Sequence, residues 1–389
     1  NYSIGRVPCR RGEKMKRLIF HIGQPKTGST SLQYFLAANR LALAEQGIAY
    51  ASFRGSSLKW QNRLRHKLVD RFSNTLPASL GWESNHTNLS YEIGYARDSE
   101  ERFSPARLTF AKLQDFILGC AEDTIIVSSE SLLYFKRMQA KLQPLAEAVT
   151  TAGTDIEVVC FLRPQHQLMS SFYAQVTKRL TNDLPFAEFC EDFLTKRHRA
   201  AGTKLNDWRV LPRTKITPLP FTRARLEPNI ETVFFTTLGL DDRIPDLLRT
   251  AGGQVANESP GPMTIEACRR ATHALSASGE DISRIQRRHF SKAINAAGDR
   301  LGWNAEKFNG IDAHWCERIR TAFADQNEKL AKRHWGEPWH EVFAHDYEGE
   351  FISNEITRDR TSRQLNELID ETVQDCARQT GIKLPATPD

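Results

Sequence analysis

The sequence predicts an α/β fold built on a doubly wound parallel sheet. Two observations lead to this class. Short runs of apolar and β-branched residues alternate with longer segments of helical periodicity from residue 17 to about residue 221. A glycine-containing loop also connects the first of these runs directly to a helix. With 389 residues, of which 40% are hydrophobic and 26% charged, the chain is long and apolar enough to bury a substantial core.

The expected strands lie in the first two thirds of the chain. Residues 17–23 predict a buried strand that ends at a glycine, and apolar residues at helical spacing predict a helix from Ser29 to about Gln46. Further strands are expected over 48–51, 124–128, 155–162 and 215–221, and further helices over 107–120, 131–149 and 164–180. Prolines in the last strand favour an edge position, because proline cannot donate to a ladder. We expect Trp208 to pack just before that strand.

Two other regions follow different patterns. Residues 52–110 are polar, aromatic and irregular, which predicts a large insertion over one face of the sheet, with short helices such as 57–72. After about residue 245 the strand signals fade, and helical periodicity returns over 263–278, 281–297, 312–333 and 360–380. We therefore expect an α/β core over 15–245, with the insertion at 52–110, and a helical extension over 246–389 packed on that core.

Charge and cysteine usage limit the classes of function. Lys and Arg number 53 against 47 Asp and Glu, so the formal net charge is +6. This small excess suits a small anionic ligand and argues against a nucleic acid, which requires a concentrated basic stripe. The seven scattered cysteines favour free thiols over disulfides or structural zinc. Because we find neither a signal stretch nor the roughly 18 apolar residues of a membrane span, we expect a cytoplasmic protein.

The most informative segment is the loop Gly23, Gln24, Pro25, Lys26, Thr27, Gly28, Ser29 and Thr30. A strand ends before it and a helix begins within it, so several backbone N–H groups point at one place beside the positive end of the helix dipole. Ser29 and Thr30 add hydroxyl groups, and Lys26 adds a positive charge. The glycines have the spacing of a P-loop, but the lysine precedes the second glycine. This pattern predicts a phosphate-binding loop that differs from those of nucleoside triphosphatases.

Over residues 18–33 this loop resembles the one that binds the 5′-phosphosulfate in the sulfotransferase family, with bacterial carbohydrate-type members the most similar. Ser29 stands where the family often has Thr, and it keeps the hydroxyl group. The family has a second element for the 3′-phosphate, an Arg at a strand end and a Ser eight residues later, which Arg163 and Ser171 match. Ser170 is a chemical alternative, but the spacing favours Ser171. The resemblance implies a sheet of the P-loop NTPase-like type.

The resemblance also implies the reaction. A sulfotransferase moves a sulfuryl group from 3′-phosphoadenosine 5′-phosphosulfate to a hydroxyl or amine acceptor and releases adenosine 3′,5′-bisphosphate. Lys26 is then expected to stabilise charge on the leaving phosphate. No metal is expected, because a sulfuryl group carries less charge than the terminal phosphoryl group that kinases transfer with Mg²⁺.

The general base is less closely specified by the sequence. Glycan sulfotransferases use a Glu after the second core strand, which points to Glu130, after residues 124–128. If the chain is instead aligned with these proteins on Tyr134 and Phe135, Ser129 takes the position of the catalytic Glu. His66 and His86 are alternatives, because cytosolic sulfotransferases use a His. His21 is interpreted as a structural neighbour of the loop.

The acceptor is expected to be a carbohydrate, from the resemblance to glycan-type members and from the aromatic residues of the insertion, which are suited to stacking on sugars. Two other classes share some of these features. A P-loop kinase or ATPase has the same strand, loop and helix, with Glu130 at a Walker-B-like position. A non-catalytic relative would bind the nucleotide or a glycan without transfer. The displaced lysine and the Arg163–Ser171 pair argue against the kinase, and the intact Lys26 and Arg163 argue against the binding module.

Overall fold

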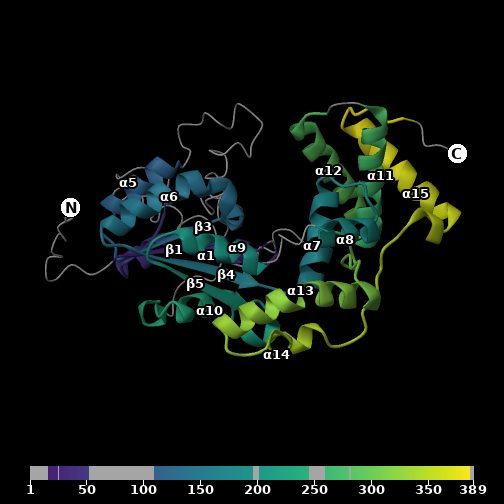
Figure 1. Ribbon diagram of the computed structural model, residues 1–389. Helices are drawn as coiled ribbons and strands as arrows, with labels where there is room; N and C mark the ends of the chain where they lie inside the picture. The colour runs from purple at the N-terminus through teal and green to yellow at the C-terminus, as the bar shows by residue number, and fades with distance from the viewer. Residues whose placement is uncertain are drawn as a thin grey trace. The chain divides into compact units, whose positions relative to one another are not determined.

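The computed structural model describes residues 16–24, 26–51, 109–195, 201–244, 259–279 and 282–385 (Figure 1). Within it the chain divides into two compact units. The first contains residues 1–162 and 203–254, and the second contains 163–202 and 255–389. Residues 163–202, which the sequence assigns to the α/β core, thus group with the C-terminal helices. Residues 52–108 of the expected insertion lie outside the described residues.

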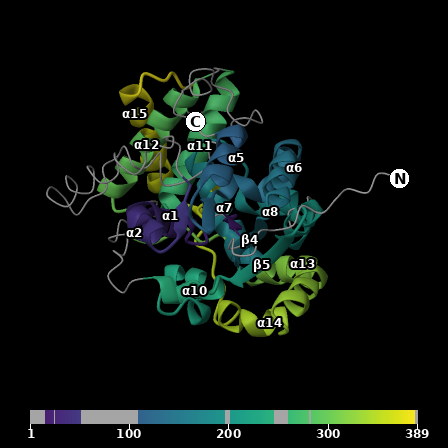
Figure 2. The same ribbon diagram turned by 90° about the vertical axis from the view of Figure 1, so that its left-hand side faces the viewer.

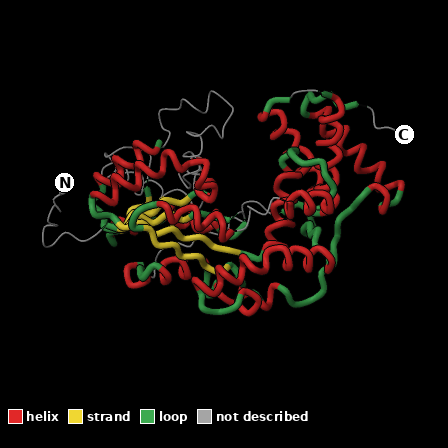
Figure 3. Tube along the Cα trace, in the orientation of Figure 1, coloured by secondary structure: helices red, strands yellow, loops and turns green. Residues whose placement is uncertain are grey.

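The first unit contains one parallel sheet among the described residues (Figure 3). Its strands are β1 (Arg17–His21), β2 (Ile48–Tyr50), β3 (Thr124–Ser128), β4 (Asp155–Leu162) and β5 (Thr214–Pro220). They lie in the order β2-β3-β1-β4-β5, and every neighbouring pair is parallel. The predicted α/β class with a parallel sheet is therefore confirmed. So is the edge position of the proline-containing strand β5, which among the described strands pairs only with β4.

Strands β3 and β4 have the bounds that the sequence predicts, whereas two helices of the first unit differ from their predictions. The helices of this unit are α1 (Ser29–Ala38), α2 (Arg40–Glu45), α5 (Phe110–Gly119), α6 (Phe135–Thr151), α9 (Ala201–Asp207) and α10 (Ile230–Thr237). The helix expected from Ser29 to Gln46 breaks at Asn39, whose side-chain amide donates to the carbonyl of Phe35 at 2.9 Å. The helix expected over 131–149 starts with a 3-10 turn, η3 (Glu130–Tyr134), before α6 begins.

Helices cover both faces of this sheet, as Figure 1 shows for α6 and α10. On one face, Ile19 of β1 packs with Phe35 of α1 and with the apolar side of α10. On the other face, the ring of Trp208 packs between two phenylalanine rings. Its centroid lies 5.3 Å from the ring centroid of Phe20 and 5.1 Å from that of Phe135 on α6. Trp208 is fully buried, so its predicted packing role is confirmed. Because β1 is buried on both faces, the loop that follows it starts from a rigid position in the sheet.

The second unit is helical over its described residues. It contains α7 (Gln165–Lys178), α8 (Phe186–Thr195), α11 (Pro262–Ser278), α12 (Arg284–Arg300), α13 (Ala313–His334), α14 (Trp339–Val342) and α15 (Arg363–Gln379). The four long C-terminal helices were predicted within a few residues, whereas α8 and α14 were not predicted. Helices α11, α12 and α15 gather around one apolar cluster, and they lie together in Figures 1 and 2. Helices α7, α8 and α13 enclose a second, aromatic cluster.

Two further properties concern the described residues of both units. The six cysteines within the described ranges are free thiols, and five of them are buried. In the part of the chain that the structure describes, we find no helix with both the length and the apolar character that crossing a membrane requires.

Candidate functional site

The loop after β1 has an unusual backbone. Lys26 and Gly28 both adopt left-handed conformations, with φ of 64° and 71°. For a lysine this conformation costs about 1–2 kcal/mol, and such strain gathers at ligand-binding sites. The hydroxyl of Thr27 donates to the carbonyl of Gln24 at 2.8 Å and closes the turn between them. The described residues of the loop are thus stabilised by contacts among their own atoms.

Gly28 connects this loop to α1. Its carbonyl accepts the first helical hydrogen bond, from the N–H of Leu32 at 3.2 Å. A Cβ atom at residue 28 would lie 2.7 Å from Cδ1 of Ile230 and 3.2 Å from the ring of Phe221, so glycine is required both for its φ and for space. No side chain among the described residues caps the helix. The N–H groups of its first turn thus face the loop, as in sites that bind phosphate or sulfate groups.

Ser29 is buried at the start of this helix. Only 2% of the residue is exposed, and its hydroxyl has no hydrogen-bond partner among the described residues. The hydroxyl lies against Gly23, where a Cβ atom would overlap it. A buried polar atom without a partner costs free energy, so this hydroxyl is suited to a ligand that reaches the loop. Thr30, the next residue, is half-buried in the first turn of α1.

Glu130 lies beside the same loop. His21 pairs in register with Ser128, so the residues two positions further along, Gly23 and Glu130, leave the sheet at the same level. A Cβ atom at Gly23 would be 3.1 Å from Cγ of Glu130. Glu130 is half-buried at the start of η3. The structure therefore brings together the loop and the carboxylate that the sequence analysis singled out as a base.

Ser129, the alternative to Glu130, has a structural role. Its hydroxyl accepts from the N–H of Ser131 at 3.3 Å and lies 2.6 Å from the hydroxyl of the same residue. Ser129 thus caps η3, and it is fully buried. These contacts use its hydroxyl, so Glu130 is the better placed of the two for proton transfer.

His21 supports the loop from the interior of the sheet. Its Nδ1 lies 2.7 Å from the hydroxyl of Ser128, which also accepts from Nε2 of Gln33 at 3.1 Å. Burial lowers the pKa of His21 to about 4, so the imidazole is neutral at pH 7. This agrees with the interpretation of His21 as a structural neighbour. No sequence pattern marks Ser128 or Gln33 as partners of His21, because the fold and not a motif brings these three side chains together.

Arg163 and Ser171 meet in the second unit. Arg163 directly follows β4, and Ser171 lies on α7. Nη1 of Arg163 donates to the hydroxyl of Ser171 at 3.3 Å, and Nη2 donates to Oε1 of Gln167 at 2.8 Å. Burial lowers the pKa of Arg163 to about 10, against the opposing effect of the Asp346 carboxylate, so the guanidinium stays charged at pH 7. Ser170 instead accepts from the N–H of Gly310 at 3.2 Å, which leaves Ser171 as the partner of Arg163.

Three residues named as site candidates lie outside the described residues: Pro25, His66 and His86. The same holds for the aromatic residues of the insertion. Two residues near Arg163, Gln167 and Asp346, were not predicted as part of any site. Gln167 lies one helical turn from Arg163 and was detectable in principle, whereas Asp346 is remote in sequence.

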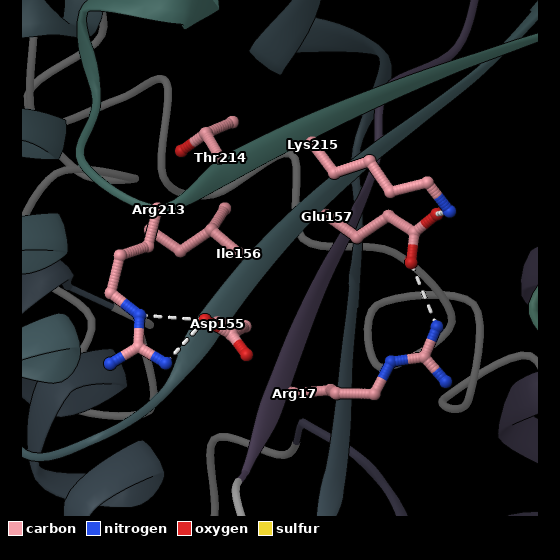
Figure 4. A pocket seen from close by; sticks show the side chains of 7 residues that line it. All are labelled: Arg17, Asp155, Ile156, Glu157, Arg213, Thr214 and Lys215. Carbon is pink, nitrogen blue, oxygen red and sulfur yellow. Dashed lines mark hydrogen bonds and ion pairs between the residues drawn. The ribbon is translucent and has the colours of Figure 1, made fainter.

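A charged cavity of about 530 Å³ lies elsewhere in the first unit, at the amino ends of β1, β4 and β5 (Figure 4). Its charges are paired with one another. Glu157 binds Arg17 at 2.7 Å and Lys215 at 2.9 Å, and Arg213 binds Asp155 at 2.6 Å. Ligands of open α/β sheets bind at the carboxyl ends of the strands. We therefore assign these ion pairs to the stability of the sheet edge.

The fold is that of an α/β protein with a glycine-containing loop at the carboxyl end of its central strand. No model of a known protein family matches the chain, and a search of curated proteins found no match. The resemblance to sulfotransferases thus rests on the loop and on the Arg163–Ser171 pair.

Proposed function

We propose that the protein is a sulfotransferase that uses 3′-phosphoadenosine 5′-phosphosulfate, on a sheet of the P-loop NTPase-like type. The observation that carries the proposal is the loop between β1 and α1, where the buried hydroxyl of Ser29 has no partner among the described residues and Glu130 lies alongside. The strand order supports it. Strands β2 and β3 lie on one side of β1, and β4 and β5 lie on the other side. The chain therefore changes direction across the sheet beside β1, and ligands of open α/β sheets bind at such a switch point.

In this proposal the loop binds the 5′ end of the donor. Backbone N–H groups from Lys26 to Thr30 and the hydroxyl of Ser29 bind the phosphosulfate, helped by the dipole of α1. The donor supplies a sulfuryl group whose bond to the phosphate oxygen breaks as the acceptor oxygen bonds to sulfur. Lys26 stabilises the negative charge that develops on the leaving phosphate. Glu130 accepts the proton of the attacking hydroxyl.

Arg163 and Ser171 are the residues to which the resemblance assigns the 3′-phosphate of the nucleotide. A guanidinium gives two parallel, charge-assisted hydrogen bonds to a phosphate, and the adjacent hydroxyl adds a third. The acceptor is a hydroxyl compound, and the resemblance to glycan-type members favours a carbohydrate. A cytoplasmic location, which the free thiols favour, belongs to the same proposal.

Thermal unfolding tests the proposal against the kinase or ATPase that shares its strand, loop and helix. Saturating adenosine 3′,5′-bisphosphate without Mg²⁺ should raise the unfolding temperature by about 5 °C, because a ligand that binds only the folded state stabilises it. Mg-ATP should have little effect. Stabilisation by Mg-ATP alone would instead favour a kinase.

Sulfate transfer to a panel of glycans and small alcohols then separates an enzyme from a binding protein. Stabilisation by the bisphosphate with no transfer to any acceptor would favour the non-catalytic nucleotide-binding relative.

A further inference from the structure

Three consecutive residues at the start of α7 are held by C-terminal elements of the second unit. The amides of Gln165 and Asn327 on α13 bind each other through two hydrogen bonds, of 2.7 and 2.9 Å. Nε2 of His166 lies 3.1 Å from the backbone carbonyl of Asp346, and Nε2 of Gln167 donates to Oδ1 of the same Asp346 at 2.7 Å. Asp346 ends a short 3-10 turn, η8 (Ala344–Asp346). The helix turn that follows Arg163 is thus fixed from two sides.

Gln167 links Asp346 to Arg163. Its NH₂ group donates to the carboxylate of Asp346, while its carbonyl oxygen accepts from Nη2 of Arg163 at 2.8 Å. A carboxylate only accepts hydrogen bonds, so it forces the NH₂ group of Gln167 toward itself and the carbonyl oxygen toward the guanidinium. Arg163 only donates, so the two partners together hold the amide in one orientation. Without Asp346, the NH₂ group of Gln167 loses the acceptor that holds this side chain beside Arg163.

Two hydrogen bonds, to Ser171 and Gln167, hold the plane of the Arg163 guanidinium. Ser171 binds Nη1 and Gln167 binds Nη2, on a side chain that otherwise has many rotamers. A planar fork that is held before the ligand arrives loses less entropy when it binds phosphate. The negative charge of Asp346 also opposes the lowering of the Arg163 pKa by burial.

We propose that Asp346, through Gln167, is a positioning residue that orients Arg163 toward the 3′-phosphate of the nucleotide. The C-terminal helical unit then sets the preference for a 3′-phosphorylated nucleotide. The inference rests on the proposed role of Arg163.

The test compares two ligands by titration calorimetry, adenosine 3′,5′-bisphosphate and adenosine 5′-monophosphate, which lacks the 3′-phosphate. Asp346→Ala and Gln167→Met should each weaken binding of the bisphosphate about tenfold, as loss of an orienting partner does at other sites, and leave the monophosphate unchanged. Asp346→Asn keeps an acceptor for Gln167 and should stay within about twofold of the wild type. Glu348→Ala, which removes an exposed carboxylate two residues away, is the matched control for charge.

The outcomes separate this inference from the proposed function. A wild type without preference for the bisphosphate would overturn both. A preference that Arg163→Met removes but that Asp346→Ala and Gln167→Met retain would overturn the inference alone. Equal weakening of both ligands in the two variants would show a general structural role and would also contradict it.

Discussion

The two regions that we propose as phosphate-binding sites are made from different groups. The loop after β1 is made mainly of backbone, with left-handed residues at Lys26 and Gly28 and the start of α1 behind them. The region around Arg163 is made of side chains, with Ser171 and Gln167 on either side of a guanidinium. A backbone site keeps most of its N–H groups when one side chain is removed, whereas a side-chain site loses its charge. The first region should therefore keep most of its nucleotide affinity when one side chain is removed, whereas the second should lose it.

Lys26→Ala gives the largest expected effect. The sulfate transfer rate should fall by about 10²–10³-fold, because the lysine acts on charge that develops in the transition state. Binding of adenosine 3′,5′-bisphosphate should weaken far less, since the loop amides remain. Rates and dissociation constants of the variant are compared with those of Lys141→Ala, a change at an exposed lysine of α6. A normal transfer rate in Lys26→Ala would defeat the role proposed for this residue.

Replacing Gly28 with Ala tests the shape of the loop. The variant combines left-handed strain with a contact of 2.7 Å to Ile230, and should lose about 3 kcal/mol of stability together with nucleotide binding. Gly153→Ala is the matched control, because its φ of 88° is also positive but no heavy atom lies within 4 Å of the added Cβ. That control should cost about 1 kcal/mol and leave binding intact. Urea unfolding measures the free energy of unfolding of both variants. Equal losses of stability would mean that the contact with Ile230 adds nothing to the cost of the left-handed strain.

The pH dependence of stability tests the neutral histidine under the loop. Burial lowers the pKa of His21 to about 4 in the folded chain, against 6.5 for an exposed histidine. The unfolded chain thus binds more protons between these values, and stability falls as the pH drops from about 6.5 to 4. The total effect of this group is about 3 kcal/mol. Urea unfolding across this range should show a flatter profile for His21→Gln than for the exposed-site control His289→Gln, and identical slopes would refute the assignment.

His166 gives the second unit a comparable group. Burial lowers its pKa to about 4, and the bond to the carbonyl of Asp346 opposes this change. Each unit therefore contains a buried histidine that is neutral at pH 7.

Local patterns explain what the sequence could predict. Strands β3 and β4 are short, apolar and bounded by turn residues, so both were predicted at the residues where they occur. The loop was predicted because its glycines, lysine and hydroxyls are contiguous. The break at Asn39 was missed, because a side-chain amide that bonds to the preceding turn leaves no trace in apolar spacing.

Contacts between distant segments were beyond sequence reasoning. Asp346 lies 179 residues from Gln167, and no pattern connects them. The grouping of residues 163–202 with the C-terminal helices also depends on such contacts, because the sequence shows only that helix α7 follows β4.

A crystal structure with adenosine 3′,5′-bisphosphate tests the central claim most directly. We expect the 5′-phosphate to lie against the loop N–H groups, Lys26 and the hydroxyl of Ser29, and the 3′-phosphate to bind Arg163 and Ser171. A nucleotide bound elsewhere, with the loop empty or with its 3′-phosphate away from Arg163, would contradict it.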